Sequence, residues 1–320
     1  MAKYYIVADG GGSKLQAVLY DENLKIIRTS TSTGVNQLFK PVDAVLDNLR
    51  QVLSDLLRDD IDEVESADLC LVCARSLAES VFERDGRIKQ VVYHGEAELA
   101  LAAAFAENGV VALSGTGSDV FMVSNGRRLG TVGGWGPLLG DEGSGYDIGL
   151  KTLKAAIYAQ DGRGEETVLL DMVMEKWKCS TLWDIVSHLA NNPDARHEVA
   201  SAATLASRAA NAGDRVAIGI YEYAAKELFL QAKTLIEKFR TEWNKTVVIT
   251  GGAWKGCRVM LDRFREEICR EYPGSTVLTP AFEPVVGCVV LRCLRDGMSM
   301  DEIRARLALE FSEFKTNYDI

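Results

Sequence analysis

The 320-residue chain lacks long apolar runs and has a deficit of positive charge. No stretch approaches the about 20 apolar residues that a membrane-spanning helix needs. The first residues, MAKYYIVADGGG, predict a strand entering a glycine turn rather than a secretory signal. The formal net charge of -10 argues against a broad positive field for nucleic acid or anionic lipid. We therefore expect a protein that binds neither a membrane nor nucleic acid.

The cysteines form no recognisable disulfide framework. The seven are scattered and odd in number, which suits a reducing cytoplasm. Cys70 and Cys73 have C-x-x-C spacing, but they lie in the apolar run LCLVCA. No second cysteine pair or nearby histidine completes a metal site. We interpret the two residues as part of a buried strand, with a redox or metal site as the alternative.

A short structural unit occurs twice along the chain. In the first copy, the β-prone residues 4–8 lead into the turn DGGGSK, followed by strand residues 15–20, a turn at 21–23 and a third strand near Ile26. In the second copy, residues 110–113 lead into SGTGS, followed by a strand at 120–124, an Asn-Gly turn and a strand from Leu129. A duplicated lobe explains this repetition most simply.

Helices are predicted between and after these units. Apolar residues recur at helical spacing over 42–56, and further helical patterns cover 98–106, 214–239, 280–295 and 299–314. The segment TVVIT at 246–250 predicts a buried strand, and residues 159–166 predict an exposed loop. Alternating strands and helices indicate the α/β class. The length favours two lobes, which we place at 1–108, completed by a C-terminal helix within 298–320, and at 109–297.

The first glycine turn has the composition of a phosphate-binding loop. Three glycines after a strand allow the backbone N–H groups to approach phosphate oxygens closely. Asp9 is placed to hold Mg²⁺, and Lys14 to neutralise phosphate charge. The turn matches neither a Walker motif nor a dinucleotide fingerprint, because the next element is a strand. An ordinary tight hairpin remains the alternative for this turn taken alone.

Three further glycine-rich segments extend the pattern. The turn Ser114–Ser118 offers the same chemistry as the first turn, and two such turns together could hold a triphosphate. In GGWGPLLGDEGSG, Asp141 is presented by a close-packed loop and could accept hydrogen bonds from sugar hydroxyls; a solvated acidic turn is the alternative. Gly251 and Gly252 end a strand and could let a flat base lie against the backbone.

The order DGGGSK, SGTGS, GGWGPLLGDEGSG and ITGG resembles the N-acetylglucosamine kinase group of the BadF/BadG/BcrA/BcrD ATPase-like families. The resemblance covers nearly the whole chain. It implies an α/β protein of two actin-like (ribonuclease H-like) lobes, as in the sugar kinase/Hsc70/actin superfamily, with ATP, Mg²⁺ and a sugar in the cleft between them.

The resemblance also implies roles for individual residues. It implies nucleotide binding by two phosphate loops and an adenosine motif, which here are Asp9, Gly10, Gly11, Gly12, Ser13, Lys14, Gly115, Thr116, Gly117, Ser118, Gly251 and Gly252. It implies that Asn36 and Asp141 bind the sugar. Asp214, in NAGDRVA, matches a segment near the adenosine, and PVVGC at 284–288 matches the opening of a late helix.

The chain departs from the family pattern at the catalytic base. The family has an aspartate in a D-A pair, whereas this chain has Glu96 followed by Ala97. A glutamate keeps the carboxylate but lengthens its reach by about an ångström. We expect Glu96 to deprotonate the sugar hydroxyl. The alternative is a surface glutamate favoured by the start of a helix.

Two more departures concern the acceptor. The family often has asparagine where this chain has Asp119, and an acidic group facing the sugar would favour a cationic amine such as glucosamine. An expected glycine-serine turn reads Ala74-Arg75-Ser76, and Arg75 could pair with the carboxylate of a muramic acid. A surface residue is the equal alternative for Arg75.

The sequence thus predicts a cytoplasmic kinase that phosphorylates a hydroxyl of an amino sugar or N-acetylhexosamine with ATP. N-acetylglucosamine, glucosamine and N-acetylmuramic acid remain open as acceptors, and a homodimer remains open as the assembly. An ATPase that activates a radical dehydratase is one alternative function. Such activators use a cluster-binding cysteine pair. The other alternative is a sugar-sensing protein without catalysis.

Overall fold

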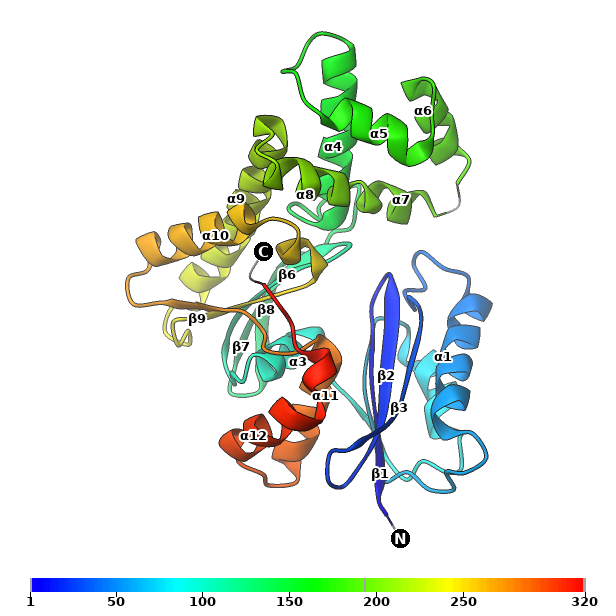
Figure 1. Ribbon diagram of the computed structural model, residues 1–320. Helices are drawn as coiled ribbons and strands as arrows, with labels where there is room; N and C mark the ends of the chain where they lie inside the picture. Colours follow the sequence, from blue (N-terminus) through cyan, green and yellow to red (C-terminus); the bar gives the residue numbers. More distant parts are fainter. Residues whose placement is uncertain (1, 193, 319–320) are drawn as a thin grey trace. The chain divides into compact units, whose positions relative to one another are not determined.

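A computed structural model describes residues 2–192 and 194–318 (Figure 1). The described chain divides into two compact units. Unit 1 contains the residues up to Glu107 together with Pro280–Thr316. Unit 2 contains Asn108–Thr279 together with Asn317 and Tyr318. The chain therefore leaves unit 1 after Glu107, returns to it at Pro280 and ends in unit 2.

Unit 1 is built on a mixed five-stranded sheet. Its strands are β1 (Tyr4–Gly10), β2 (Lys14–Asp21), β3 (Ile26–Thr33), β4 (Ser66–Leu71) and β5 (Val91–Tyr93). They lie in the order β3-β2-β1-β4-β5. The pairs β1–β2 and β2–β3 are antiparallel, whereas β4 runs parallel to both β1 and β5. The carboxyl ends of β1, β4 and β5 therefore meet at one edge.

Helices cover both faces of this sheet (Figure 1). The helical elements are α1 (Val42–Leu57), α2 (Arg75–Ala78), a π-helical turn (Glu79–Glu83), α3 (Glu96–Ala103), α11 (Pro284–Arg295), α12 (Met300–Glu310) and a 3-10 turn (Ser312–Phe314). The apolar stripe of α1 packs on β2 and β3 as its spacing predicts, with Val45, Leu49 and Val52 fully buried. On the opposite face, α11 packs on β1, β4 and α3.

Unit 2 repeats the sheet of unit 1. Its strands are β6 (Gly109–Ser114), β7 (Ser118–Ser124), β8 (Arg127–Gly133), β9 (Thr246–Thr250) and β10 (Thr276–Leu278). They lie in the order β10-β9-β6-β7-β8, with β6–β7 and β7–β8 antiparallel and β9 parallel to β6 and β10. Strand by strand, this is the arrangement of unit 1. The predicted duplication is confirmed.

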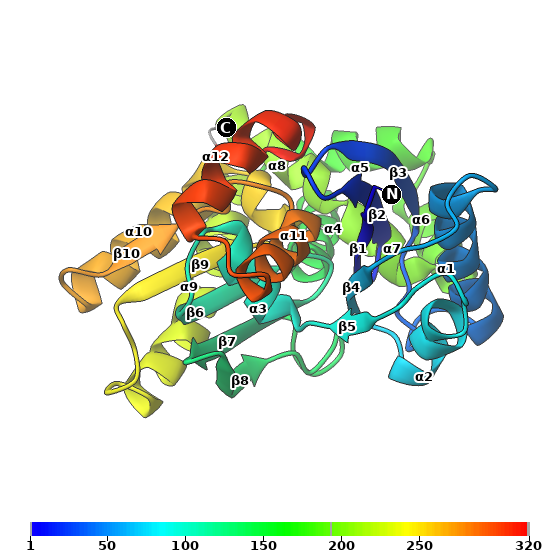
Figure 2. The same ribbon diagram turned by 90° about the horizontal axis from the view of Figure 1, so that it is seen from below.

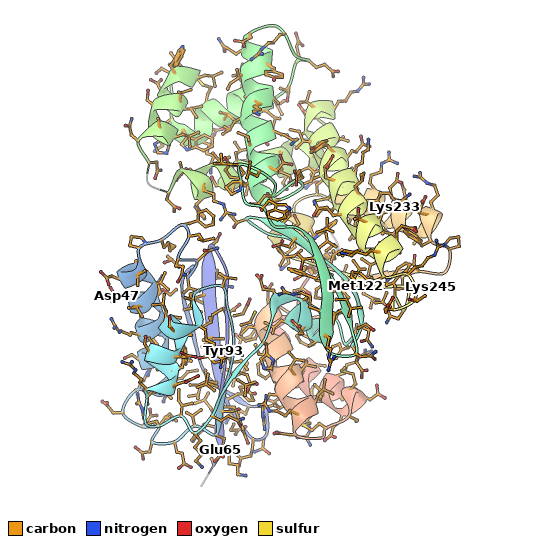
Figure 3. All side chains as sticks on the ribbon, turned by 180° about the vertical axis from the view of Figure 1, so that it is seen from behind. Asp47, Glu65, Tyr93, Met122, Lys233 and Lys245 are labelled. Carbon is orange, nitrogen blue, oxygen red and sulfur yellow. The ribbon has the colours of Figure 1, made fainter. Side chains whose placement is uncertain are left out.

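The helices of unit 2 form its core and an added helical segment. They are α4 (Gly145–Gln160), α5 (Leu169–Trp177), α6 (Leu182–Ala190), α7 (Ala195–Ser201), α8 (Ala203–Asn211), α9 (Arg215–Lys238), a 3-10 turn (Gly252–Lys255) and α10 (Arg258–Glu271). Helices α9 and α10 pack together, and α9 lies on β6, β7 and β8 (Figure 2). Met122 of β7 is buried in that core (Figure 3). The segment from α5 to α7 was not predicted from the sequence.

The boundaries of the units differ from our expectation. We placed the return to the first lobe at residue 298, but it begins at Pro280, so α11 belongs to unit 1. The physical reason is that α11 is apolar on several faces and is buried between α12, α3 and the sheet. A side chain at Gly287 would collide with the carbonyl of Leu99 on α3, which shows how closely these helices pack.

The predicted class of the chain is confirmed, because both units are α/β. Among the described residues, no helix combines the length and the apolar character that crossing a bilayer requires.

Candidate active site

The motifs of unit 1 gather at the edge where β1, β4 and β5 end. Asp9 and Gly10 close β1, and Glu96 follows β5 after His94 and Gly95. Since these three strands are parallel, their carboxyl ends lie side by side. Open parallel sheets bind ligands at such an edge. The sequence-predicted Asp9 and Glu96 therefore belong to one edge of unit 1.

The first glycine turn is packed against the segment that carries Asn36. The N–H of Val35 donates to the carbonyl of Gly11 at 3.0 Å, and a side chain at Gly34 would collide with the backbone of Gly12. The turn closes through a bond from the N–H of Gly11 to the carbonyl of Lys14 at 2.9 Å. This packing places the segment before Asn36 against the turn.

Asn36 is partly used by its own loop. Its Oδ1 accepts a hydrogen bond from the N–H of Leu38 at 3.0 Å. The Nδ2 amide, which is a donor, makes no hydrogen bond with the described residues. That group is thus available to a hydroxyl or carbonyl of a ligand.

Asp9 is a strongly perturbed carboxyl at this edge. Burial raises its pKa to about 7, while Lys14 opposes the shift and Glu283 adds to it. Burial disfavours the ionised form of this carboxyl group, and a bound cation would stabilise that form. No group of three or more metal-binding side chains occurs among the described residues, so a bound Mg²⁺ would take its other ligands from phosphates and water. On these grounds Asp9 fits a magnesium site.

Glu96 is the first residue of α3, after the N-cap Gly95. The partial positive charge at a helix start favours an ionised carboxylate there. The next residues of the helix, Ala97 and Leu99 to Ala103, are buried, which fixes α3 against unit 1. The backbone in front of Glu96 is also fixed, because the N–H of His94 donates to the carbonyl of Leu69 at 2.8 Å.

A network of charged side chains centred on the buried Asp68 lies next to this edge of the sheet. Asp68 of β4 contacts Nε2 of His94 at 2.8 Å and accepts two hydrogen bonds from Arg295, at 2.7 and 3.0 Å. The hydroxyl of Ser66 donates a further hydrogen bond at 2.9 Å. Burial alone would raise the pKa of Asp68, but the bonds from His94 and Arg295 outweigh it and lower the pKa. The network joins β4, the end of β5 and α11.

The motifs of unit 2 gather at the equivalent edge. The turn at 114–118 packs against the segment 141–146 through four hydrogen bonds. The hydroxyls of Ser114 and Ser118 donate to the carbonyls of Gly143 and Glu142 at 2.7 and 2.8 Å. The N–H groups of Gly145 and Tyr146 donate to the carbonyls of Gly115 and Thr116 at 2.7 and 3.2 Å. The second turn is therefore held from behind by the acidic motif.

Asp141 points to the same turn. It lies in the left-handed region, with a φ of +59°, and its side chain is 4% exposed. Oδ2 accepts a hydrogen bond from Nη2 of Arg196 at 3.1 Å, whereas Oδ1 has no donor among the described residues. A Cβ placed on Gly117 would lie 3.1 Å from both Asp141 and Arg196. The carboxylate thus has one oxygen fixed and one ready to accept.

Gly251 joins this group from β9. It has a φ of +104°, and any side chain there would collide with the carbonyl of Ser114. Strands β6 and β9 are parallel neighbours, so the two glycine segments must meet at their ends. Trp254 anchors the segment through a bond from Nε1 to the carbonyl of Ala112 at 3.1 Å. Gly251 and Gly252 therefore lie beside the second turn.

Three other predicted residues have different surroundings. The carboxylate of Asp119, on β7, lies against Gly134 of the glycine-rich loop. Asp214 caps α9, accepting from the N–H of Ala217 at 2.9 Å; burial raises its pKa, but the backbone donors prevail and lower it. That role is structural. Arg75 pairs with Glu79 at 2.9 Å and lies over the ring of Tyr93, which Figure 3 labels.

The C-x-x-C pair differs from our prediction. Cys70 is buried in β4, but Cys73 lies beyond the strand, which ends at Leu71, and is only half-buried. Burial raises the pKa of both thiols. A raised pKa disfavours the thiolate that a metal or cluster needs. The pair therefore has the properties of structural cysteines.

Arg196 and the Asp68 network were missed from the sequence. Arg196 lies in a segment without a motif, 55 positions from Asp141. Asp68 and Arg295 are 227 positions apart, and no local pattern links them. A lone aspartate directly before the apolar run LCLVCA was the available signal, because a buried charge requires a partner.

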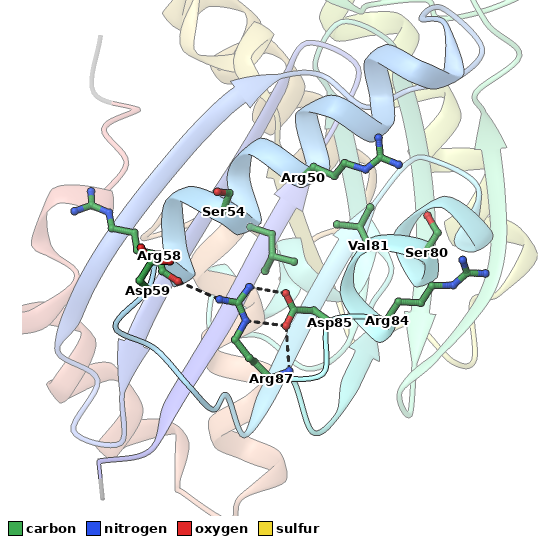
Figure 4. Close-up of a pocket in the computed structure, with 10 residues that line it drawn as sticks. Arg50, Ser54, Arg58, Asp59, Ser80, Val81, Arg84, Asp85 and Arg87 are labelled. Carbon is green, nitrogen blue, oxygen red and sulfur yellow. Dashed lines mark hydrogen bonds and ion pairs between the residues drawn. The ribbon is translucent and has the colours of Figure 1, made fainter.

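A separate polar pocket of about 460 Å³ lies at the end of α1 in unit 1 (Figure 4). Arg50, Arg58, Arg84 and Arg87 line it, together with two aspartates. Arg87 is neutralised by Asp85 at 2.7 Å. In Figure 4 the guanidinium groups of Arg50 and Arg58 point to opposite ends. None of the predicted site residues lines this pocket, and its charges do not converge on one point.

The chain is similar to known proteins over most of its length. The model of the BadF/BadG/BcrA/BcrD ATPase family matches residues 8–291. An N-acetylmuramic acid/N-acetylglucosamine kinase of Clostridium acetobutylicum is 29% identical, over 90% of this chain and 98% of its own length. An N-acetyl-D-glucosamine kinase of Dictyostelium discoideum is also 29% identical, over 90% of this chain and 97% of its own length.

A solved structure shares the fold. A ROK family glucokinase from Streptomyces griseus, in complex with glucose and AMPPNP, matches with a TM-score of 0.61 and 16% identity. The match covers 92% of this chain and 100% of the glucokinase. The predicted fold of two actin-like lobes is thereby confirmed.

Proposed function

Because the chain belongs to the BadF/BadG/BcrA/BcrD ATPase family, we propose that it is an ATP-dependent kinase of amino sugars or N-acetylhexosamines. The observation that carries the proposal is that both units have the same arrangement at the carboxyl end of the central strand. Each unit ends its central strand in a glycine turn, and each turn is packed against a segment with a sugar-binding type of side chain. The two curated relatives are kinases of N-acetylated sugars and match nearly the whole chain.

The nucleotide is held by the glycine turns in this proposal. The N–H groups of Gly10 to Ser13 and of Gly115 to Ser118 bind phosphate oxygens, and Lys14 adds a positive charge. Gly251 packs against the second turn, and Gly252, with open space at its Cβ position, leaves the backbone accessible to the adenosine. Asp9 would be the protein ligand of Mg²⁺. When bound, Mg²⁺ supplies positive charge that offsets the charge of the transferring phosphoryl group.

The acceptor is held by Asn36, Asp119 and Asp141. The Nδ2 amide of Asn36 donates to the sugar, and Oδ1 of Asp141 accepts from a sugar hydroxyl. Glu96 takes the proton of the hydroxyl that attacks. The acceptor oxygen forms a bond to the γ-phosphorus while the bond from that phosphorus to the β–γ bridging oxygen breaks, and ADP leaves. Positioning and electrostatics supply most of the rate enhancement.

The reaction can be tested by coupled detection of ADP. The purified protein is assayed with MgATP and, in turn, N-acetylglucosamine, glucosamine, N-acetylmuramic acid and N-acetylmannosamine. We expect ADP release that depends on at least one of these sugars and yields a phosphorylated sugar by mass spectrometry. ADP release without phosphorylated sugar, or sugar binding without ADP release, would contradict a kinase. The latter result would indicate a sugar-sensing protein.

Two further properties accompany this proposal. All seven cysteines are free, so we place the reaction in the reducing cytoplasm, where ATP is available. Iron in the purified protein would favour the dehydratase-activating ATPase instead. We leave the assembly as a choice between a monomer and a homodimer, which light scattering resolves.

A further inference from the structure

Arg196 and Asp141 form a largely buried ion pair beside the second glycine turn. Nη2 of Arg196 lies 3.1 Å from Oδ2 of Asp141, and the side chains are 18% and 4% exposed. Arg196 belongs to α7, which packs on α4, and α4 begins directly after the Asp141–Ser144 segment. The pair therefore joins the added helical segment of unit 2 to the acceptor motif.

The ion pair of Arg196 and Asp141 lies against Gly117 of the second glycine turn. A Cβ on Gly117 would lie 3.1 Å from Nη2 of Arg196, 3.1 Å from Oδ2 of Asp141 and 3.2 Å from its Oδ1. A side chain at 117 would therefore press on both members of the ion pair. The guanidinium of Arg196 and both carboxylate oxygens of Asp141 thus lie close to the space beside Gly117 that a Cβ would occupy.

The positive charge of Arg196 offsets the negative charge of Asp141 in the acceptor motif. Without Arg196, the buried carboxylate of Asp141 would be uncompensated, which is costly and attracts cations. Two other carboxylates of this part of unit 2 have different neighbours. Asp119 lies against Gly134, and Glu198 of α7 is engaged by Nε1 of Trp177 at 3.0 Å and lies 3.8 Å from His188. Arg196 is the cation that balances Asp141.

We infer that Arg196 is a specificity-determining residue, which makes the acceptor site favour hexosamines with an uncharged, acylated nitrogen over those with a free ammonium group. The inference rests on the proposed function and goes beyond it by naming the acceptor class. Asp141 alone would attract an ammonium group. With Arg196 at 3.1 Å, the attraction is balanced, and the guanidinium repels a second cation. The site then binds the sugar through its hydroxyls.

Asp119 taken alone favours the opposite acceptor, glucosamine. Charge decides between the two, because N-acetylglucosamine and glucosamine share the same hydroxyls. The relevant quantity is the ratio of kcat/KM for N-acetylglucosamine to kcat/KM for glucosamine. A purely structural role of Arg196 would lower both values together and leave the ratio unchanged.

The test compares this ratio in the natural protein and in Arg196→Gln at slightly acidic pH, where the amine of glucosamine is protonated. We expect the ratio to fall by at least about tenfold, because a unit charge a few ångströms away at an effective dielectric constant of about 20 can contribute up to about a thousandfold. Arg196→Lys keeps the charge and should keep most of the ratio. Arg208→Gln, the same change on exposed Arg208 of the next helix, should not alter it.

The outcomes separate the inference from the proposed function. If the natural protein phosphorylates no hexosamine, the proposed function fails. If it is active but Arg196→Gln keeps the ratio, the inference fails. Should Arg196→Gln not fold, as judged by thermal melting, the natural protein itself is measured against pH. We then expect the ratio of the two kcat/KM values to fall as the pH rises and the amine of glucosamine loses its proton. A ratio that stays constant with pH would overturn the inference.

Discussion

Arg295 donates two hydrogen bonds to the carboxylate of Asp68, from Nη1 to Oδ1 at 2.7 Å and from Nη2 to Oδ2 at 3.0 Å. This bidentate pair ties the last residue of α11 to the central part of β4. His94 contacts the same carboxylate two residues before Glu96. A residue from the late segment of unit 1 therefore helps to fix the backbone in front of the proposed catalytic base.

Replacing Asp68 by asparagine should destabilise the protein markedly. The change leaves Arg295 without its buried partner, which typically costs about 3–5 kcal/mol. Asp62→Asn, at an exposed site, should cost less than about 0.5 kcal/mol. Because the folded pKa of Asp68 is lowered, its contribution is present above the unfolded value of 3.8 and is lost as the pH falls through the folded pKa. Urea unfolding at neutral and acidic pH measures both effects.

Replacing Glu96 by glutamine should lower kcat far more than the affinity for ATP. The amide keeps the size of the side chain but cannot accept the hydroxyl proton, and general-base catalysis typically contributes about 10²–10⁴-fold. Glu98→Gln, in the same turn of α3, should leave kcat near that of the natural protein. Steady-state kinetics with the preferred sugar tests this, and unchanged turnover in Glu96→Gln would remove Glu96 from the mechanism.

The sequence predicted the repeated sheet because its signals are local. A β-prone run, a glycine turn and a second run specify a hairpin without help from distant residues. The same holds for Gly251, whose strand-ending position follows from TVVIT. The segments that follow β1 and β4, and those that follow β6 and β9, then lie at one edge of each sheet, because these strands are parallel neighbours.

The residues that the sequence did not reveal depend on distant contacts. Arg196 acquires its meaning only when α7 packs on α4 and brings it to Asp141. The return of α11 to unit 1 is likewise decided by packing against α3, as the close approach at Gly287 shows. Composition cannot specify which apolar helix covers which sheet. Cys73 was misplaced for a similar reason, because a strand boundary is set by its ladder partners.

Replacing Asp9 by asparagine should stabilise the metal-free protein at high pH while abolishing activity. Burial raises the folded pKa of Asp9 to about 7, above its unfolded value of 3.8. The folded state therefore binds the extra proton between these values, and the penalty for ionisation grows as the pH rises through them. The variant should gain on the order of 1–3 kcal/mol at pH above 7 and nothing near pH 4.

Bound MgATP should reduce the difference in stability between the natural protein and Asp9→Asn. MgATP binds Asp9 in the proposal, so it should raise the melting temperature of the natural protein more than that of Asp9→Asn. Differential scanning fluorimetry with EDTA and with MgATP, at acidic and alkaline pH, provides the comparison. Equal stability of the two proteins across the pH range would contradict the pKa of Asp9 that burial raises.

Replacing Gly251 by alanine should disrupt the second turn, whereas the same change at Gly219 should be harmless. Gly251 has a φ of +104°, and a methyl group there would collide with the carbonyl of Ser114, so the backbone of the turn must move. We expect a loss of about 2–4 kcal/mol in stability and a large loss of ATP affinity. Gly219 lies exposed within α9, with open space around its Cβ, and Gly219→Ala should stabilise by about 0.5–1 kcal/mol. Urea unfolding and nucleotide titration of both variants measure the contrast. Natural ATP affinity in the Gly251→Ala variant would show that this backbone does not contact the nucleotide.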